Sequence, residues 1–285
     1  MTQDPSILSQ ETYDTFRTKG YAVLPQFYDE QLDIKPIREG IRTIIALLCE
    51  KYELDAPVST AEEAMTKGYR ALIAKNRAWG GEVYDAVKQI PAFARLVANP
   101  RNETVFKDLR HGSIPGIAAG GYGIRIDNPG EEKFRAQWHQ EFPSQLRSVD
   151  GIVYWTPLLP ISADMGPVQI AEGSHAEGLI PVYSDSKGVG KTGAYALHLD
   201  RCEERLGKYS HVAPLSKPGD LILMDFLTLH QSGYNVSAIP RWSIQFRYFN
   251  YADPLGVRIG WSGSFAAGVN FAEVLPELVA EQAGM

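Results

Sequence analysis

The stretch QWHQEF, residues 137–142, places two good metal ligands, His139 and Glu141, one residue apart. Imidazole nitrogens and carboxylate oxygens both bind transition metals. Residues 135–142 have the composition of a β-strand, in which alternate side chains share a face. Gln137, His139 and Glu141 would then point the same way, with the two ligands roughly 6–7 Å apart at the backbone. Two ligands do not make a site, and a chance pair on a solvated strand is the alternative, so a third ligand is required.

His230 is the best candidate for this third ligand. It ends the segment GDLILMDFLTLH (219–230), which has the composition of a buried strand followed by a short connection. Of the remaining histidines, His175 is predicted to be a turn residue with a local hydrogen bond. The other three are predicted to be surface or ordinary polar residues: His111, His198 and His211.

Arg241, eleven residues after His230, opens a strand (241–251) that has two distinct faces. An unpaired buried charge is costly, so a polar face inside a small barrel is expected only where it lines a site. If the polar face points inward, Arg241 is a fixed cation suited to bidentate capture of a carboxylate. The alternatives are a solvated polar face and a structural salt bridge at Arg241. The polar face consists of Arg241, Ser243, Gln245 and Arg247.

The combination of these spacings resembles the iron(II)- and 2-oxoglutarate-dependent dioxygenases of the phytanoyl-CoA dioxygenase type. The segment WHQE (138–141) resembles that family's W/L-H-Q-D, and DMGPVQIAEGSHAEG (164–178) resembles its glycine- and histidine-containing turn. The segment from 218 to 248 resembles its G-D-x-x-x-F…H-x-S-x-x-N-x-S…R pattern, and GYAVLPQFYDEQ (20–31) resembles its opening strand. The resemblance covers about residues 20–250.

The resemblance implies a cofactor set and a reaction. His139, Glu141 and His230 would hold Fe(II), leaving positions for 2-oxoglutarate and O2. Arg241 would hold the distal carboxylate of 2-oxoglutarate. A small-molecule substrate would be hydroxylated, desaturated or cyclised, with release of succinate and CO2. Further contacts to the cosubstrate implied by the resemblance are Ser232, Ser243 and Trp155.

Two positions depart from the family pattern. Glu141 stands where aspartate is usual, and this carboxylate is longer by one methylene. A carboxylate here argues against the halogenase variant of the family, in which a small residue leaves room for halide. Glu172 stands where proline is expected, which we interpret as a surface change.

The substrate is less well defined by the sequence than the metal site. Arg125, Gln137 and Arg247 are candidates to face the barrel interior, and the two cations favour a polar or anionic small molecule. Solvation or pairing with carboxylates is the alternative for both arginines. Two other functions remain open: a non-catalytic metal- or ligand-binding barrel of the same fold, and a metal-dependent isomerase or hydrolase.

The elements that must position these residues form two parts of one predicted domain, residues 1–285. Helices are expected at 6–18, 29–52, 60–76 and 80–98, the last one broken at Pro91, so that about residues 1–112 are mainly helical. About residues 113–251 contain many short β-rich runs separated by Gly, Pro, Asn and Asp. A helix is expected at about 271–282. This order predicts an α+β fold with flanking helices, and the resemblance implies a double-stranded β-helix (jelly-roll or cupin-like) core.

Composition limits the partners and the compartment. The formal net charge is −6, which argues against a nucleic-acid binder. No apolar run is long enough to span a bilayer, and the N-terminus lacks the pattern of a secretory signal. With only two cysteines, Cys49 and Cys202, a cytoplasmic protein is expected; the oligomeric state is not indicated. The segment GVGKTG (188–193) is similar to a phosphate-binding loop, but that pattern needs glycine at position 185, where this chain has aspartate. We therefore expect an ordinary loop at 188–193.

Overall fold

The N-terminal part is helical, as expected from its apolar spacing. The computed structural model describes residues 7–184, 197–263 and 271–280. In the longest helix, apolar side chains four residues apart are buried, and the first helix begins at the capping side chain of Ser9 and ends at Gly20, which has φ 75°. π-helical turns at Glu30–Ile34 and Ala64–Gly68 precede the second and fourth helices. The helices are α1 (Gln10–Lys19), α2 (Lys35–Lys51), α3 (Ala61–Glu63), α4 (Tyr69–Lys75), α5 (Trp79–Val87), α6 (Pro91–Val97) and α7 (Pro100–Leu109).

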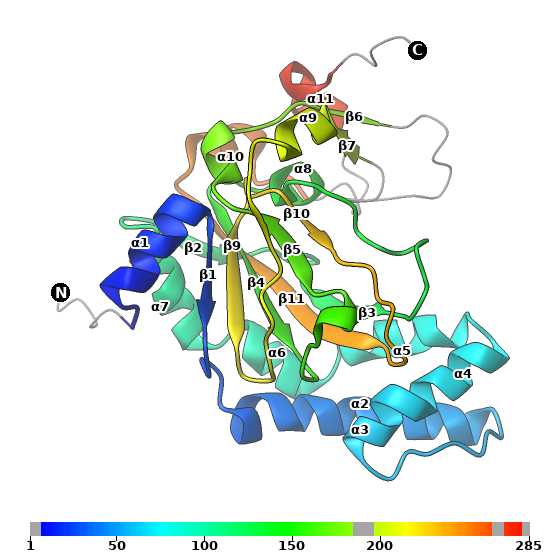
Figure 1. The fold of residues 1–285 in the computed structure, drawn as a ribbon. Helices are drawn as coiled ribbons and strands as arrows, with labels where there is room; N and C mark the ends of the chain where they lie inside the picture. Colours follow the sequence, from blue (N-terminus) through cyan, green and yellow to red (C-terminus); the bar gives the residue numbers. More distant parts are fainter. Residues whose placement is uncertain (1–6, 185–196, 264–270, 281–285) are drawn as a thin grey trace, which may run out of the picture.

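Two antiparallel sheets form the core, which is a double-stranded β-helix (Figure 1). The major sheet has the order β1-β9-β4-β11-β2, with β3 also paired to β11; the minor sheet has the order β10-β5-β8. A further hairpin joins β6 and β7. The strands of the major sheet are β1 (Tyr21–Leu24), β2 (Pro115–Ile117), β3 (Gly123–Asp127), β4 (Gly151–Pro157), β9 (Leu221–Asp225) and β11 (Arg241–Asn250). The other strands are β5 (Val168–Ala171), β6 (Val182–Ser184), β7 (Leu197–Leu199), β8 (His211–Val212) and β10 (His230–Ser232).

Alternation along β11 divides its side chains between two cores. Trp242, Ile244 and Phe246 are fully buried in the core between the major sheet and the N-terminal helices. The opposite face of the major sheet packs against the minor sheet, as Trp155 and Val168 show by sharing the second core. The polar residues of β11 therefore point between the two sheets, which answers the question that the sequence left open.

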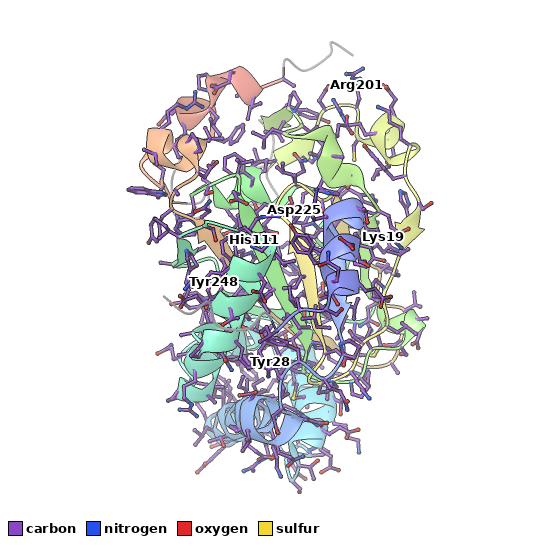
Figure 2. The ribbon with its side chains drawn as sticks, turned by 90° about the vertical axis from the view of Figure 1, so that its left-hand side faces the viewer. Lys19, Tyr28, His111, Arg201, Asp225 and Tyr248 are labelled. Carbon is purple, nitrogen blue, oxygen red and sulfur yellow. The ribbon has the colours of Figure 1, made fainter. Side chains whose placement is uncertain are left out.

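Buried tyrosine hydroxyls fix the helices to the major sheet. Tyr28 donates to the side chain of Asn102 on α7, at 2.7 Å, and Tyr154 donates to the backbone carbonyl of the same residue, at 2.9 Å. Tyr248 donates to the carbonyl of Val97 at the end of α6, and burial raises the pKa of Tyr248 to about 12. Figure 2 shows Tyr28 and Tyr248 in this helical side of the molecule. The helices thus support β4 and β11 from the side opposite the polar face.

The structure corrects two expected elements. Residues 135–142 do not form a strand: within them only His139 makes a β-bridge, and Glu141 begins a short helix, α8 (Glu141–Gln145). The helix expected at 271–282 is one turn, α11 (Phe271–Val274), followed by a 3-10 turn at Pro276–Leu278, because Pro276 cannot donate a helical hydrogen bond. The segments 188–193 and 281–282 lie outside the described residues. Two further short helices are α9 (Cys202–Leu206) and α10 (Pro254–Ile259).

No helix in the described parts of the chain is both long enough and apolar enough to cross a bilayer.

Candidate metal centre

His139 and His230 are joined by their backbones. The N–H of each residue donates to the carbonyl of the other, both at 3.1 Å, so that the loop carrying His139 is fixed to the first residue of β10. Their imidazole rings lie 4.3 Å apart, centroid to centroid. This reciprocal pairing brings together two histidines that are 91 positions apart in the chain.

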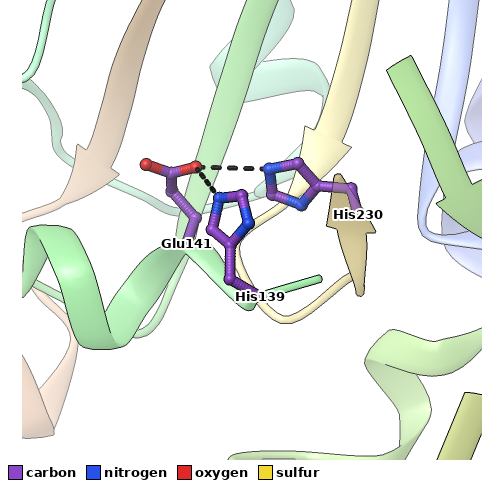
Figure 3. Close-up of side chains that lie close together, drawn as sticks. All are labelled: His139, Glu141 and His230. Carbon is purple, nitrogen blue, oxygen red and sulfur yellow. Dashed lines mark ion pairs between the residues drawn. The ribbon is translucent and has the colours of Figure 1, made fainter. Parts of the chain in front are cut away.

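Glu141 completes the cluster from the first position of α8. Its backbone N–H donates to the carbonyl of Phe226, in the connection that leads from β9 to His230, at 2.9 Å. Its Oε2 atom lies 3.4 Å from Nε2 of His230 and 3.7 Å from Nε2 of His139 (Figure 3). One ligand atom from each of the three residues lies within 4.8 Å of the others. Two imidazoles and one carboxylate in this arrangement form the facial triad typical of non-haem iron sites.

The backbone sets the tautomer of both imidazoles. Nδ1 of His139 lies 2.7 Å from the carbonyl oxygen of Gln137, and Nδ1 of His230 lies 2.9 Å from that of Thr228. A carbonyl can only accept, so each Nδ1 carries the proton and each Nε2 presents a lone pair to the centre. Burial, and then the neighbouring ring of His230, lower the pKa of His139, which favours the neutral form that binds metals.

Arg247 holds the second oxygen of the glutamate. Its Nε donates to Oε1 of Glu141 at 2.9 Å, while its Nη1 donates to the carbonyl of Gly121 at 2.9 Å. Burial would raise the pKa of Glu141, but Arg247 and the two imidazoles outweigh it and keep that pKa well below its usual range. Glu141 is therefore an anion with one oxygen fixed by Arg247. Its other oxygen, Oε2, is buried without a hydrogen-bond partner among the described residues, so the three side chains fit a divalent metal ion.

Arg241 lies at the other end of the polar face of β11. It is 1% exposed, and its Nη2 donates to Oδ2 of Asp127 at 2.7 Å and to Oγ of Ser232 at 3.1 Å. Arg125 donates to the other oxygen of Asp127 at 2.7 Å. Burial would raise the pKa of Asp127, but the two guanidinium groups keep it well below its usual range. Nε and Nη1 of Arg241, and the hydroxyl of Ser243, are buried without a partner in the described part of the chain.

A cavity of about 260 Å³ opens above the triad. Its wall includes all three residues of the triad and several others that the sequence singled out: Trp155, Ser232, Arg125 and Arg247. Arg241 lies behind Ser232 and is not part of the wall, and Ser243 is also outside it. Gln137 is exposed, and its side chain bonds to Glu132 and Arg135, while its backbone carbonyl orients His139.

A sequence profile of the phytanoyl-CoA dioxygenase family matches residues 16–243, which contain all three triad residues and Arg241. The chain belongs to the phytanoyl-CoA dioxygenase family. Phytanoyl-CoA dioxygenases are Fe(II)- and 2-oxoglutarate-dependent oxygenases, and membership makes this chain an oxidoreductase of that class. No curated protein sequence matches the chain significantly.

Solved structures share the fold at low sequence identity. EctD from S. alaskensis, solved with 2-oxoglutarate and 5-hydroxyectoine, is similar with a TM-score of 0.56 and 19% identity over 88% of this chain and 78% of that one. The α-ketoglutarate-dependent carbocyclase SnoK from nogalamycin biosynthesis has a TM-score of 0.54 and 14% identity over 86% and 85% of the two chains. The epimerase SnoN from the same biosynthesis has a TM-score of 0.54 and 16% identity over 85% and 82%.

Sequence reasoning about this phytanoyl-CoA dioxygenase homologue missed Asp127. The residue lies two positions after Arg125 on β3 and is paired in register with Arg241. Alternation in β3 puts both of its charged side chains on the face that looks between the sheets. The pattern Arg-x-Asp in a short strand was the available signal, but the pairing of β3 with β11 was needed to interpret it.

Proposed function

We propose that this oxygenase binds Fe(II) through His139, Glu141 and His230 and couples oxidation of a small molecule to decarboxylation of 2-oxoglutarate by O2. The products are the oxidised substrate, succinate and CO2. The observation that carries the proposal is the orientation of the candidate ligand atoms. Both Nε2 lone pairs lie together with Oε2 of Glu141 at the wall of the cavity, and this oxygen has no hydrogen-bond partner in the described part of the chain.

The side chains of this protein would hold the metal ion and keep its ligands oriented. His139, Glu141 and His230 would hold the Fe(II) ion, which would supply the oxidative chemistry with the keto acid and O2. The carbonyls of Gln137 and Thr228 keep the imidazoles in the metal-binding tautomer, and Arg247 keeps Glu141 in place. Trp155, Val168 and Met224 contribute apolar surface to the wall of the same cavity.

We further propose that Arg241 binds the distal carboxylate of 2-oxoglutarate. The three charged groups Arg125, Asp127 and Arg241 carry one net positive charge, which matches one carboxylate. Nε and Nη1 of Arg241, which have no hydrogen-bond partner among the described residues, support this role, since a buried guanidinium normally uses all its N–H groups. The neighbouring Ser232, Ser243 and Trp155 are the proposed further contacts with the cosubstrate.

The substrate itself is proposed to be a small molecule that is hydroxylated, desaturated or cyclised. Arg125 and Arg247 line the cavity and remain candidates to contact it, but each already faces a carboxylate of the protein. That pairing favours a polar reacting end over a strongly anionic one. Gln137 lies on the exposed side of the loop, where only a substrate extending out of the cavity would meet it.

The test of the iron and cosubstrate sites uses matched histidine variants. Under anaerobic conditions, adding Fe(II) and 2-oxoglutarate should produce a visible absorption band in the wild type and in His111→Ala, in which an exposed histidine is removed. The band should be absent in His230→Ala. In air, a substrate screen scored by succinate should give Fe(II)-dependent turnover. A band without succinate for any substrate would instead favour the non-catalytic metal-binding barrel, and no band in the wild type would refute the proposal.

The test of Arg241 compares two arginines that share one carboxylate. In Arg241→Met the Kd of 2-oxoglutarate, titrated by the same absorption band, should rise at least tenfold. In Arg125→Met, which also removes a partner of Asp127, the rise should be smaller. If Arg125→Met weakened the binding of 2-oxoglutarate more than Arg241→Met did, the assignment of the distal carboxylate to Arg241 would be wrong.

A further inference from the structure

A second cavity adjoins the one above the metal centre. It has a volume of about 290 Å³ and shares two wall residues, Tyr84 and Arg125, with the first cavity. Strand β3 lies at the edge of the major sheet and packs against α5 (Figure 1). The wall residues of the second cavity come from both elements, so this cavity lies where the sheet edge meets the N-terminal helices. Its other wall residues are Tyr69, Arg77, Gly80, Gly81, Ile126 and Phe134.

The size of the first cavity leaves little room for a substrate. Pockets that bind small organic molecules usually have volumes of about 300–1,000 Å³. The first cavity, at about 260 Å³, lies just below this range, yet under the proposed function it must hold 2-oxoglutarate and the reacting part of the substrate together. A substrate too large for the remaining space would extend outside the first cavity, and the second cavity adjoins it at the shared wall residues Tyr84 and Arg125.

The second cavity has the chemistry of a site for a flat apolar group. Tyr69, Tyr84 and Phe134 supply aromatic side chains, and two consecutive glycines of α5 supply wall without side chains. Arg77 is not available as a site for an anion, because it makes a bidentate ion pair with Glu131 at 2.6 and 2.9 Å. The guanidinium of Arg77 also lies over the ring of Phe134, 5.0 Å from its centroid, which adds another flat surface to the wall.

We propose that the second cavity binds a planar apolar part of the substrate, such as an aromatic ring, while the polar end that reacts lies in the first cavity. The substrate would cross the edge of β3 at Arg125, with Tyr84 beside it. Tyr84 is 42% exposed and is well placed to cover the bound ring from the solvent side. This inference rests on the proposed function for the identity of the reacting end, but the binding of an aromatic group can be measured independently of it.

Gly81 gives a clean way to fill the second cavity. A Cβ atom added at this position meets nothing within 4 Å, and its φ does not require glycine. Alanine is also favoured over glycine within a helix, so the variants are expected to fold. Gly81→Trp should occupy the cavity, and Gly81→Ala should leave most of it open.

The probe for the experiment is anilinonaphthalene sulfonate, an aromatic dye whose fluorescence rises in apolar sites. The wild type and Gly81→Ala should bind one dye molecule per chain with Kd values within twofold of each other, and Gly81→Trp should bind it at least tenfold more weakly. Phe134→Ala, on the opposite wall, should also weaken dye binding. Equal dye binding by the wild type and Gly81→Trp, or no dye binding by the wild type, would overturn the inference.

The two proposals fail in different ways. The absorption band of Fe(II) with 2-oxoglutarate should be the same in the wild type and in both Gly81 variants, because this glycine is outside the first cavity. If the dye bound as expected but no protein gave the band, the proposed function would fail and the aromatic site would stand. If the band formed normally but Gly81→Trp bound the dye as tightly as the wild type, only the proposal of the aromatic site would fail.

Discussion

Asp127 is predicted to be the main electrostatic support of the polar face of β11. Its carboxylate accepts from Arg125 at 2.7 Å and from Arg241 at 2.7 Å, and it is 8% exposed. Asp127→Asn keeps the size of the side chain but removes the charge and turns an amide N–H₂ toward one of the two guanidinium groups. The buried Arg241 and the partly buried Arg125 would then be two cations without a shared anion.

The cost of this change can be estimated from the geometry. Two cations held on one carboxylate lie roughly 5 Å apart, where unit charges in an effective dielectric of about 20 repel by about 3 kcal/mol. Removing one partner of a buried ion pair typically costs about 3–5 kcal/mol. We therefore expect Asp127→Asn to lower the free energy of unfolding by about 3–5 kcal/mol.

Urea denaturation at neutral pH, followed by circular dichroism, measures the change. Asp85→Asn is the matched control, because Asp85 is 73% exposed in its ion pair with Lys88 and such pairs contribute little to stability. A loss in Asp127→Asn no larger than in this control would refute the reasoning.

The pH dependence gives a second check on Asp127. The pKa of Asp127 is lowered in the folded state, so its stabilising effect is present above the unfolded value of about 3.9 and is lost as the pH falls toward the folded pKa. The wild type should therefore lose stability below about pH 4 more steeply than Asp127→Asn, which has no carboxyl to protonate at this position.

Three further predictions concern the metal centre and the turns around it. Arg247→Met should lower the free energy of unfolding by about 3–5 kcal/mol, because Arg247 and Glu141 form one buried ion pair. The same substitution should cost much less in a Glu141→Gln background, and urea denaturation of the double-mutant cycle measures this coupling. Mn(II) at about a hundred times its Kd should stabilise the wild type by about 2.7 kcal/mol and leave His139→Ala unchanged, as measured by thermal unfolding with and without chelator. Gly166→Ala should be less stable than Gly178→Ala by about 1–3 kcal/mol. Both glycines have positive φ, but of the two only a Cβ atom at position 166 would meet neighbouring backbone, at 2.5 Å. Equal losses of stability in the two variants would show that movement of the backbone relieves the close contact.

The alternation of β11 could be predicted from the sequence, but its direction could not. Polar and apolar residues alternate clearly from Arg241 to Tyr248, so the existence of two different faces followed from the strand period. Which face is inside depends on the helices, because Trp242 and Phe246 find their apolar environment under the N-terminal helices and not between the sheets. That arrangement is a property of the whole fold and is not encoded in any window of a few residues.

The structure brings together the three side chains that the sequence predicted as metal ligands, but not by the route that the sequence indicated. A strand over 135–142 would have aligned His139 and Glu141 by alternation. A strand needs a partner along its length, and here only His139 finds one, in His230. The chain then turns into α8, so that Glu141 reaches the same point from the N-terminus of a helix. Local composition could not distinguish these two routes, because both place residues i and i+2 near one ion.

The route through α8 also bears on how Glu141 would serve in the proposed metal site, where the resemblance to the family implies an aspartate. Glu141 is fixed at its backbone by the hydrogen bond to Phe226 and at Oε1 by Arg247, so its extra methylene group spans two anchored points. A longer side chain is a disadvantage for a metal ligand mainly through the rotamer freedom that must be lost on binding. Here that freedom is already restricted by the ion pair, and the remaining oxygen is directed at the two imidazoles before any metal binds. Arg247 and Glu141 therefore act as one unit, in which the arginine restricts the rotamers of the longer carboxylate.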